Sequence, residues 1–309
     1  MKVAALDLGS NTFLLLIAEV ENGKIVRVYH DECQVTRLAQ GVDASREFHS
    51  EALARAKKCL DDYGKTIRQH RPARLLAVAT SAARDAKNKD EFFNIAHEAG
   101  IPVKVISGVL EARLTFRGAV DDLVADRRCR VVDIGGGSTE YIVGGGEHQP
   151  IGQSLDMGCV RLTEKFISTH PVPEEELGNM RAAIRGQLDG LSEGIKKGSG
   201  PLVAVAGTPT TLAAVVLGVE FDAEKIHGYE LSQTVIEEWL MKLAAMTVED
   251  RAKLPGMVPL RADVIVAGLV LLSESLRFFA EDSLIVSTRG VRFGVAQELA
   301  NENSDLSCP

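Results

Sequence analysis

The segment VDIGGGSTE, residues 132–140, combines two carboxylates with a stretch of bare backbone: Asp133 ends an apolar run, three glycines follow, and a hydroxyl pair leads to Glu140. Glycines at a strand end let backbone N–H groups approach an anion closely, and consecutive amides form a concave nest for phosphate oxygens. An aspartate beside phosphate repels it unless a cation lies between them. Mg²⁺ suits that place, because it binds through one or two carboxylates, waters and substrate oxygens. The segment therefore indicates metal-assisted phosphate binding.

A related segment opens the chain. DLGSNTFLLLI, from Asp7, and DIGGGSTEYIV, from Asp133, repeat the order of aspartate, apolar residue, glycine, small residues and renewed strand, about 126 residues apart. One such turn alone fits equally well a tight hairpin in which glycine merely supplies positive φ. The repetition favours two phosphate turns that clamp one polyphosphate chain from both sides.

Two familiar phosphate motifs are absent. No lysine follows the three glycines, so G-x-x-x-x-G-K-[ST] is not matched. Glu140 occupies the last glycine position of G-x-G-x-x-G, and a strand rather than a helix is expected after the turn.

The surrounding pattern predicts an α/β architecture, because strands alternate with helices. Asn22-Gly23 predicts a hairpin turn between the second and third strands. Strands are expected at 3–9, 12–20, 25–30, 73–80, 102–107, 131–137, 139–155 (strand, turn, strand), 201–207 and 283–288, and helices at 46–70, 87–100, 107–123, 173–196, 232–246, 261–280 and 289–301.

Composition limits the class of protein. A length of 309 residues exceeds one hydrophobic core and favours two domains. The net charge of −8 disfavours a general nucleic-acid binder. Five scattered cysteines give neither zinc spacings nor a disulfide framework, which fits a reducing cytoplasm. No uninterrupted apolar stretch of membrane-spanning length occurs, and the N-terminal apolar octet, interrupted by charges, is expected to be a strand rather than a signal peptide.

The chain resembles the exopolyphosphatase / guanosine pentaphosphate phosphohydrolase (Ppx/GppA) family, in its short two-domain form. The resemblance covers nearly the whole chain, and its motifs occur in family order: ALDLGSNTFLLLIAEV, ATSAARDAKN at 79–88, VISGVLEARLTF at 105–116, VVDIGGGSTEYIV, SLDMGCVRLTEKF at 154–166, AVAGTPTTLAAV at 204–215, KIHGYELS at 225–232, PGMVPLRADVIVAG at 255–268 and STRGVRFGV at 287–295.

The resemblance implies two actin-like domains, of the ribonuclease H-like, sugar kinase and Hsp70 superfamily, with an active cleft between them. The first domain is expected at 1–125, joined by the C-terminal helix at about 290–301, the second at 126–289, and a frayed polar tail at 302–309. The chain stops before the additional C-terminal helical domains of longer members, which favours short polyphosphate chains or nucleotides as substrates.

Roles follow from the same resemblance. Glu111 matches the glutamate that activates water, while Asp133 and Glu140 match residues that position Mg²⁺, or alternatively Mn²⁺, with Asp7 at the equivalent place in the first turn. Without the resemblance, Glu111 fits a surface ion pair with Arg113 or Lys104.

Candidate substrate contacts lie in the turns and beside them. Arg84 matches a family arginine that faces the substrate, and the planar fork of its guanidinium suits bidentate phosphate binding. The alternative interpretation of Arg84 is a solvated charge at the end of a helix. Gly207 and Thr208 are expected to form a turn where actin-like relatives hold a nucleoside. His227 and two small basic clusters are weaker candidates. The full set of phosphate contacts is Gly9, Ser10, Asn11, Arg84, Gly135, Gly136, Gly137, Ser138, Gly207 and Thr208.

The expected activity is release of terminal orthophosphate from inorganic polyphosphate, guanosine pentaphosphate or both, by metal-assisted attack of water. Two alternatives stay open: a small-molecule kinase of the same fold, and a non-catalytic sensor of an alarmone or polyphosphate. We expect no nucleic-acid or membrane partner, and the sequence leaves open a homodimer.

Overall fold

The computed structural model describes residues 1–124, 127–146 and 148–301 and divides the chain into two compact units. One comprises Met1–Gly118 and the C-terminal segment from Val291, and the other comprises Ala119–Gly290. The expected boundary at 125, the polar tail and Cys308 lie outside the described residues. The domain limits of the sequence analysis stay a prediction.

The first unit is built on a five-stranded sheet of order β3-β2-β1-β4-β5. Its strands are Lys2–Leu8 (β1), Thr12–Glu21 (β2), Lys24–Val35 (β3), Arg74–Ala79 (β4) and Val103–Val105 (β5). β1, β2 and β3 pair antiparallel, whereas β4 and β5 continue the sheet in parallel. Asn22 and Gly23, with φ of 50° and 75°, form the predicted hairpin turn, because both central residues of a type I′ turn need positive φ.

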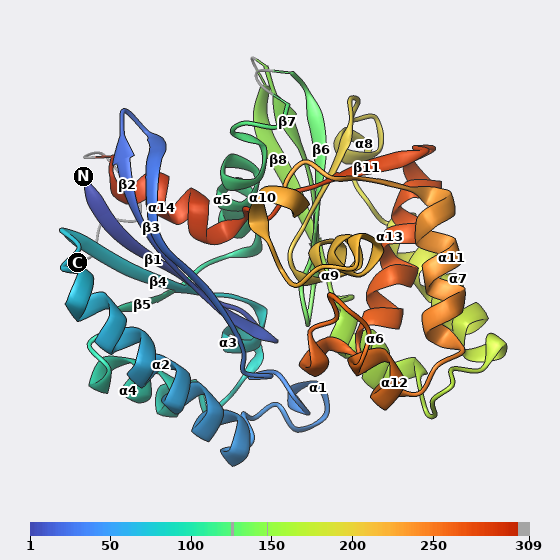
Figure 1. Ribbon diagram of the computed structural model, residues 1–309, viewed down its shortest axis with the longest axis horizontal. Helices are drawn as coiled ribbons and strands as arrows, with labels where there is room; N and C mark the ends of the chain where they lie inside the picture. The colour runs from blue at the N-terminus through green and yellow to red at the C-terminus, as the bar shows by residue number, and fades with distance from the viewer. Residues whose placement is uncertain (125–126, 147, 302–309) are drawn as a thin grey trace. The chain divides into compact units, whose positions relative to one another are not determined.

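Two layers of helices cover this sheet. Leu6, Leu15 and Ile17 share one buried cluster with residues of α2 (Ser50–His70) and α4 (Lys89–Glu98), which lie along one side of the sheet in Figure 1. Val3 and Ala5 point to the other face, where they pack with α5 (Gly108–Val120) and α14 (Val291–Leu299). Since side chains alternate along a strand, Asp7 lies on the α5 and α14 face. The unit also contains α1 (Val42–Ser45) and α3 (Ser81–Asp85).

The second unit is built on a six-stranded sheet of order β10-β11-β9-β6-β7-β8. Its strands are Cys129–Ile134 (β6), Thr139–Gly145 (β7), His148–Leu155 (β8), Leu202–Val205 (β9), Glu230–Ser232 (β10) and Ser283–Val286 (β11). β6, β7 and β8 pair antiparallel, and β9 and β11 extend the sheet in parallel from β6. Taken from β8, this order repeats the first sheet strand for strand, with β10 added at the edge. The internal duplication expected from the sequence is therefore present in the topology.

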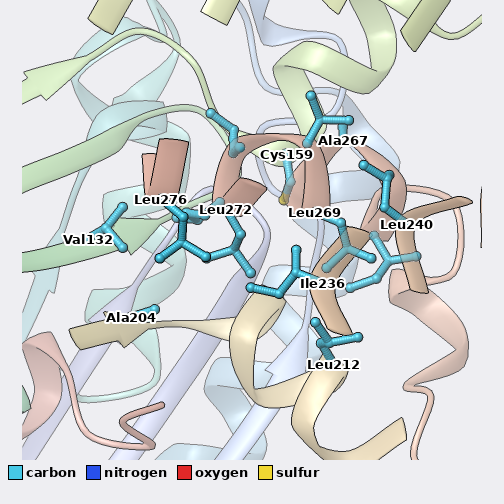
Figure 2. Packing of buried hydrophobic residues seen from close by; sticks show 14 of the residues in the cluster. Val132, Cys159, Ala204, Leu212, Ile236, Leu240, Ala267, Leu269, Leu272 and Leu276 are labelled. Atoms are coloured by element: carbon cyan, nitrogen blue, oxygen red, sulfur yellow. The ribbon is translucent and has the colours of Figure 1, made fainter. Parts of the chain in front are cut away.

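One large apolar cluster covers one face of the second sheet. Figure 2 shows part of it, with Val132 and Ala204 of the sheet near the helical residues Leu272 and Leu276. The helices of the unit are Cys159–Phe166 (α6), Glu174–Leu188 (α7), Glu193–Lys196 (α8), Gly207–Leu217 (α9), Ala223–Ile226 (α10), Gln233–Ala244 (α11), Val248–Ala252 (α12), the 3₁₀ turn Pro259–Arg261 (η1) and Ile265–Phe279 (α13). Because Val132 points into this cluster, Asp133 points to the opposite face.

Three helix predictions need correction. The helix expected at 46–70 begins only at Ser50, because Arg46 has a left-handed φ of 59° and ends α1. The single helix expected at 173–196 is two, α7 and α8, separated by the turn at Asp189–Ser192 in which Gly190 donates to the Gln187 carbonyl. The helix expected from 261 begins only at Ile265, after the η1 turn.

In the described part of the chain, no helix is long and apolar enough to cross a bilayer.

Candidate phosphate and metal site

The two glycine turns have the same hydrogen-bonding pattern. The Gly9 amide donates to the Thr12 carbonyl at 3.1 Å, and the Gly135 amide donates to the Ser138 carbonyl at 3.0 Å. A Cβ added at either glycine would lie 3.0 Å from that same carbonyl oxygen, so the tight turn favours glycine at both positions. The turns are thus equivalent in sequence, strand position and geometry.

The second turn is packed against the N-terminus of α6. The amides of Cys159, Val160 and Arg161, which begin α6, donate to the carbonyls of Gly135 and Gly136 at 2.9–3.2 Å, and Arg161 Nε donates to the Gly137 carbonyl at 2.8 Å. These bonds satisfy N–H groups that a helix start leaves without intrahelical partners.

This packing determines the direction of the turn amides. In a planar trans peptide, the carbonyl of one residue and the amide of the next point in opposite directions. Because the carbonyls of 135, 136 and 137 face α6, the amides of Gly136, Gly137 and Ser138 point away from it. Three consecutive amides facing one way can bind an anion as a backbone nest.

The first turn is packed in a related way against the loop after β3. The Ser10 carbonyl accepts from Ala39, and the Asn11 carbonyl accepts from Thr36 and Arg37, at 2.8–3.0 Å. The Asn11 side chain is only 4% exposed, yet within the described residues neither its Oδ1 nor its Nδ2 has a hydrogen-bond partner. A buried amide without partners costs about 1–3 kcal/mol per polar group. It is therefore a candidate ligand group.

Asp133 and Glu140 are brought together by strand register. They are cross-strand partners on β6 and β7, so their carboxylates lie on the same face of the sheet, 9% and 1% exposed respectively. Glu140 Oε1 accepts a hydrogen bond from Ser154 Oγ at 2.7 Å. Two buried neighbouring carboxylates repel each other, and a cation between them removes that cost.

The donor set of this pair fits Mg²⁺. Among the residues that the structure describes, no group of three or more His, Cys, Asp or Glu side chains could hold a metal. A cation at this pair would thus have two protein carboxylates and complete its shell with waters and substrate oxygens, which is how Mg²⁺ is commonly bound. Asp7 belongs to the first unit, where its Oδ1 lies beside Gly9.

Glu111 and Arg84 form an ion pair within the first unit. Arg84 Nη1, at the end of α3, donates to Glu111 Oε2 at 2.9 Å and to the Ile106 carbonyl at 2.8 Å. Glu111 lies in the first turn of α5, whose start is capped by Ser107 Oγ accepting from the Leu110 amide at 3.3 Å. Glu111 is only 6% exposed, so it is not a surface residue. The Arg84 side chain is 26% exposed and ion-paired, and it holds the Glu111 carboxylate in place.

A hydrogen bond links this pair to the first turn. Ser10 Oγ and Ser81 Oγ are 2.8 Å apart, and Ser81 begins the short helix α3 that carries Arg84. The first unit therefore brings together the turn, Arg84 and Glu111 through α3. Ser81 is not identifiable from sequence alone, because no motif relates it to Ser10 before the parallel pairing of β1 with β4 is known.

Gly207 and Thr208 begin helix α9 rather than forming a separate turn. Val205 pairs with Asp133, so the start of α9 follows the strand next to the carboxylate pair. Arg261 was not singled out from the sequence. It lies so close to Gly207 that a Cβ added to Gly207 would be 1.6 Å from Arg261 Nη1. Thr208 is buried against Gly268 of α13, which is a packing position.

His227 is tied to its surroundings by polar contacts. Its Nδ1 accepts from the Thr288 amide at 3.2 Å, so its Nε2 carries the hydrogen that faces Asp122 Oδ1 at 3.0 Å. Asp122 also pairs with Arg289 at 2.9 Å. These contacts support the structural interpretation of His227 over substrate contact.

Comparison with known proteins identifies the family of the chain. The Ppx/GppA phosphatase family matches residues 16–303. Exopolyphosphatase 2 of Mycobacterium tuberculosis is 39% identical, over 97% of this chain and 98% of that protein. The chain belongs to the Ppx/GppA phosphatase family.

Solved structures of similar proteins extend this result to the fold. The Aquifex aeolicus PPX-GPPA enzyme is 34% identical, with a TM-score of 0.80 over 96% of this chain and 99% of that chain. An exopolyphosphatase from Cytophaga hutchinsonii is 30% identical, with a TM-score of 0.85 over 96% of both chains. The two sheet units of this Ppx/GppA protein thus have the actin-like α/β fold expected from the sequence.

Proposed function

We propose that this protein is an exopolyphosphatase, which releases terminal orthophosphate from inorganic polyphosphate by metal-assisted attack of water. The observation that carries the proposal is the row of three amides at Gly136, Gly137 and Ser138, which the α6 contacts turn away from that helix at the end of β6. A phosphate bound to these amides would lie next to the strands that carry Asp133 and Glu140. The name of the M. tuberculosis relative supports polyphosphate as the substrate.

Each group has a defined task in this proposal. Asp133 and Glu140 would hold Mg²⁺ or Mn²⁺, and the metal would neutralise phosphate charge when bound. Asp7 is a candidate metal ligand of the first unit. The amides of Gly136, Gly137 and Ser138 would bind phosphate oxygens in the second unit, and Asn11 is a candidate phosphate ligand of the first unit. Glu111 would accept the proton of the attacking water, and Arg84 would hold its carboxylate in one orientation.

Phosphate release tests the proposal directly. We expect Mg²⁺-dependent orthophosphate release from short and long polyphosphate, lost on chelation, and at least about 100-fold slower in Glu111→Gln, the usual scale for loss of a general base. Glu98→Gln, an exposed glutamate paired with Lys57, is the matched control and should retain full activity.

Guanosine pentaphosphate serves as a second substrate in the same assay, because the family that the sequence resembles includes guanosine pentaphosphate phosphohydrolases. Faster release from guanosine pentaphosphate than from any polyphosphate would reassign the substrate within the same chemistry. Equal release by wild type and Glu111→Gln would overturn the assignment of the base, and no release from any substrate would overturn the proposed function.

A further inference from the structure

Three neighbouring strands of the second unit place three polar side chains in one row. Asp133 of β6 pairs with Glu140 of β7, and Glu140 pairs in turn with Ser154 of β8. Residues directly opposite each other in antiparallel strands point to the same face, so the row is continuous. At the β8 end of this row, Ser154 Oγ donates a hydrogen bond to Glu140 Oε1 at 2.7 Å.

The duplicated sheet of the first unit contains the equivalent row, with different residues. Asp7 of β1 pairs with Leu14 of β2, and Leu14 pairs with Cys33 of β3. The aspartate is common to both rows, whereas Glu140 and Ser154 correspond to Leu14 and Cys33. The carboxylate and the hydroxyl that binds it therefore occur together in one unit and are both replaced in the other.

The hydroxyl has a specific effect on a carboxylate in this position. Ser154 has one hydroxyl hydrogen, and donating it to Oε1 fixes the rotation of the Glu140 carboxylate about its last bond. Glu140 is almost completely buried beside Asp133, so a misoriented carboxylate would find little water to compensate it. Partners that orient metal-binding carboxylates contribute to metal affinity without touching the metal.

We propose that Ser154 is a positioning residue, which holds the Glu140 carboxylate in the orientation that binds the divalent cation with Asp133. This inference rests on the proposed function, because it assigns Ser154 a task in the same metal site. Nothing in the proposal requires Ser154 to contact the substrate.

The test measures metal binding apart from catalysis. Mn²⁺ binding to the full-length protein is followed by electron paramagnetic resonance without substrate, and phosphate release from polyphosphate is measured separately. For Ser154→Ala we expect Mn²⁺ affinity about 10-fold weaker and kcat about 10-fold lower, with the KM for polyphosphate unchanged. Ser154→Thr, which keeps the hydroxyl, should restore both values to near those of wild type.

Two further variants complete the design. Cys33→Ala changes the equivalent position of the first unit and should alter neither Mn²⁺ affinity nor kcat. Ser154→Cys introduces a cysteine, the residue that the first unit has at the equivalent position 33. Because a thiol is a weak hydrogen-bond donor, this variant should behave like Ser154→Ala. It replaces Ser154→Ala in the test if the alanine variant shows no cooperative thermal unfolding.

The outcomes separate this inference from the proposed function. Wild-type Mn²⁺ affinity and kcat in both Ser154→Ala and Ser154→Cys would overturn the role of Ser154 alone. A raised KM with unchanged Mn²⁺ affinity would place Ser154 at the substrate and also overturn it. If the wild type bound no Mn²⁺, or Asp133→Asn bound it normally, the metal site of the proposed function would fail, and the inference with it.

Discussion

The buried side chain of Asn11 lowers the stability of the fold. Its side-chain amide is buried without a hydrogen-bond partner in the described chain, although its backbone carbonyl accepts two bonds. Folded proteins retain such groups mainly where a ligand satisfies them, and removing them commonly raises stability at the expense of function. Asn11 is therefore a residue at which stability and ligand binding are expected to change in opposite directions.

We expect Asn11→Ala to leave the free energy of unfolding unchanged or raise it by about 1 kcal/mol, while the KM for polyphosphate rises about 10-fold from the loss of one good hydrogen-bonding group. The measurements are urea unfolding and steady-state phosphate release. Asn88→Ala is the control. Asn88 bonds both the amide and the carbonyl of Phe48, at 2.7 and 3.1 Å, so its loss should cost about 1–3 kcal/mol without changing KM. Equal destabilisation by both variants with normal KM would contradict the prediction.

Among the elements, α6 determines the geometry of the second turn. Its N-cap, Gly158, approaches the turn so closely that an added Cβ would lie 2.2 Å from the Gly136 carbonyl oxygen. The φ of Gly158 is −120°, which any residue adopts, so the need for glycine here is one of space alone. The partner is backbone and cannot rotate away, so any larger residue must move the turn.

Gly158→Ala should consequently shift the amides of Gly136 and Gly137. A displacement of about 1 Å at reacting groups lowers activity about 100-fold, and overpacking costs about 1–3 kcal/mol of stability. Phosphate-release kinetics and urea unfolding check both effects. Gly178→Ala, on the exposed face of α7 with open space around its Cα, should instead stabilise the protein by about 0.5–1 kcal/mol and keep full activity. An active Gly158→Ala variant would show that α6 does not determine the turn geometry.

The elements also show where sequence reasoning succeeds and where it stops. The Asn22-Gly23 hairpin and the two Asp-Gly turns were predictable, because local backbone requirements decide them. The bond from Arg84 to Glu111 joins residues 27 positions apart, and the bond from Ser10 to Ser81 joins residues 71 apart. Such contacts depend on which strands are neighbours, which periodicity does not specify. The resemblance to a family suggested a task for Glu111, whereas only the fold shows how it is held.

At the scale of the whole molecule, both units contain buried thiols. Burial raises the pKa of Cys59, in the first unit, from 9.0 to about 12. In the second unit, burial raises the pKa of Cys129 and of Cys159 from 9.0 to about 11. Figure 2 shows Cys159 within the apolar cluster of its unit. The folded chain therefore keeps these protons at a pH where the unfolded chain releases them.

The sign of the resulting pH dependence follows by linkage. A group whose folded-state pKa lies above its unfolded value stabilises the fold fully below the unfolded pKa, and that contribution is lost as pH rises towards the folded pKa. The free energy of unfolding should thus decline from about pH 9 upward, with each buried thiol contributing about 1.4 kcal/mol per pH unit until it titrates in the folded state. Both units contain such thiols, so both should lose stability at alkaline pH.

We expect Cys159→Ala, despite some loss of stability from its cavity, to show a shallower decline than wild type between about pH 9.5 and 10.5, by about 1 kcal/mol per pH unit. Urea unfolding at a series of pH values provides the slope. Cys33→Ala is the control for the loss of a thiol, because the Cys33 side chain is exposed. The cause is the burial of the Cys159 thiol in an apolar cluster, so this effect changes the slope and not the stability at neutral pH. A Cys159→Ala slope equal to that of wild type would mean that the buried thiol does not couple folding to alkaline pH.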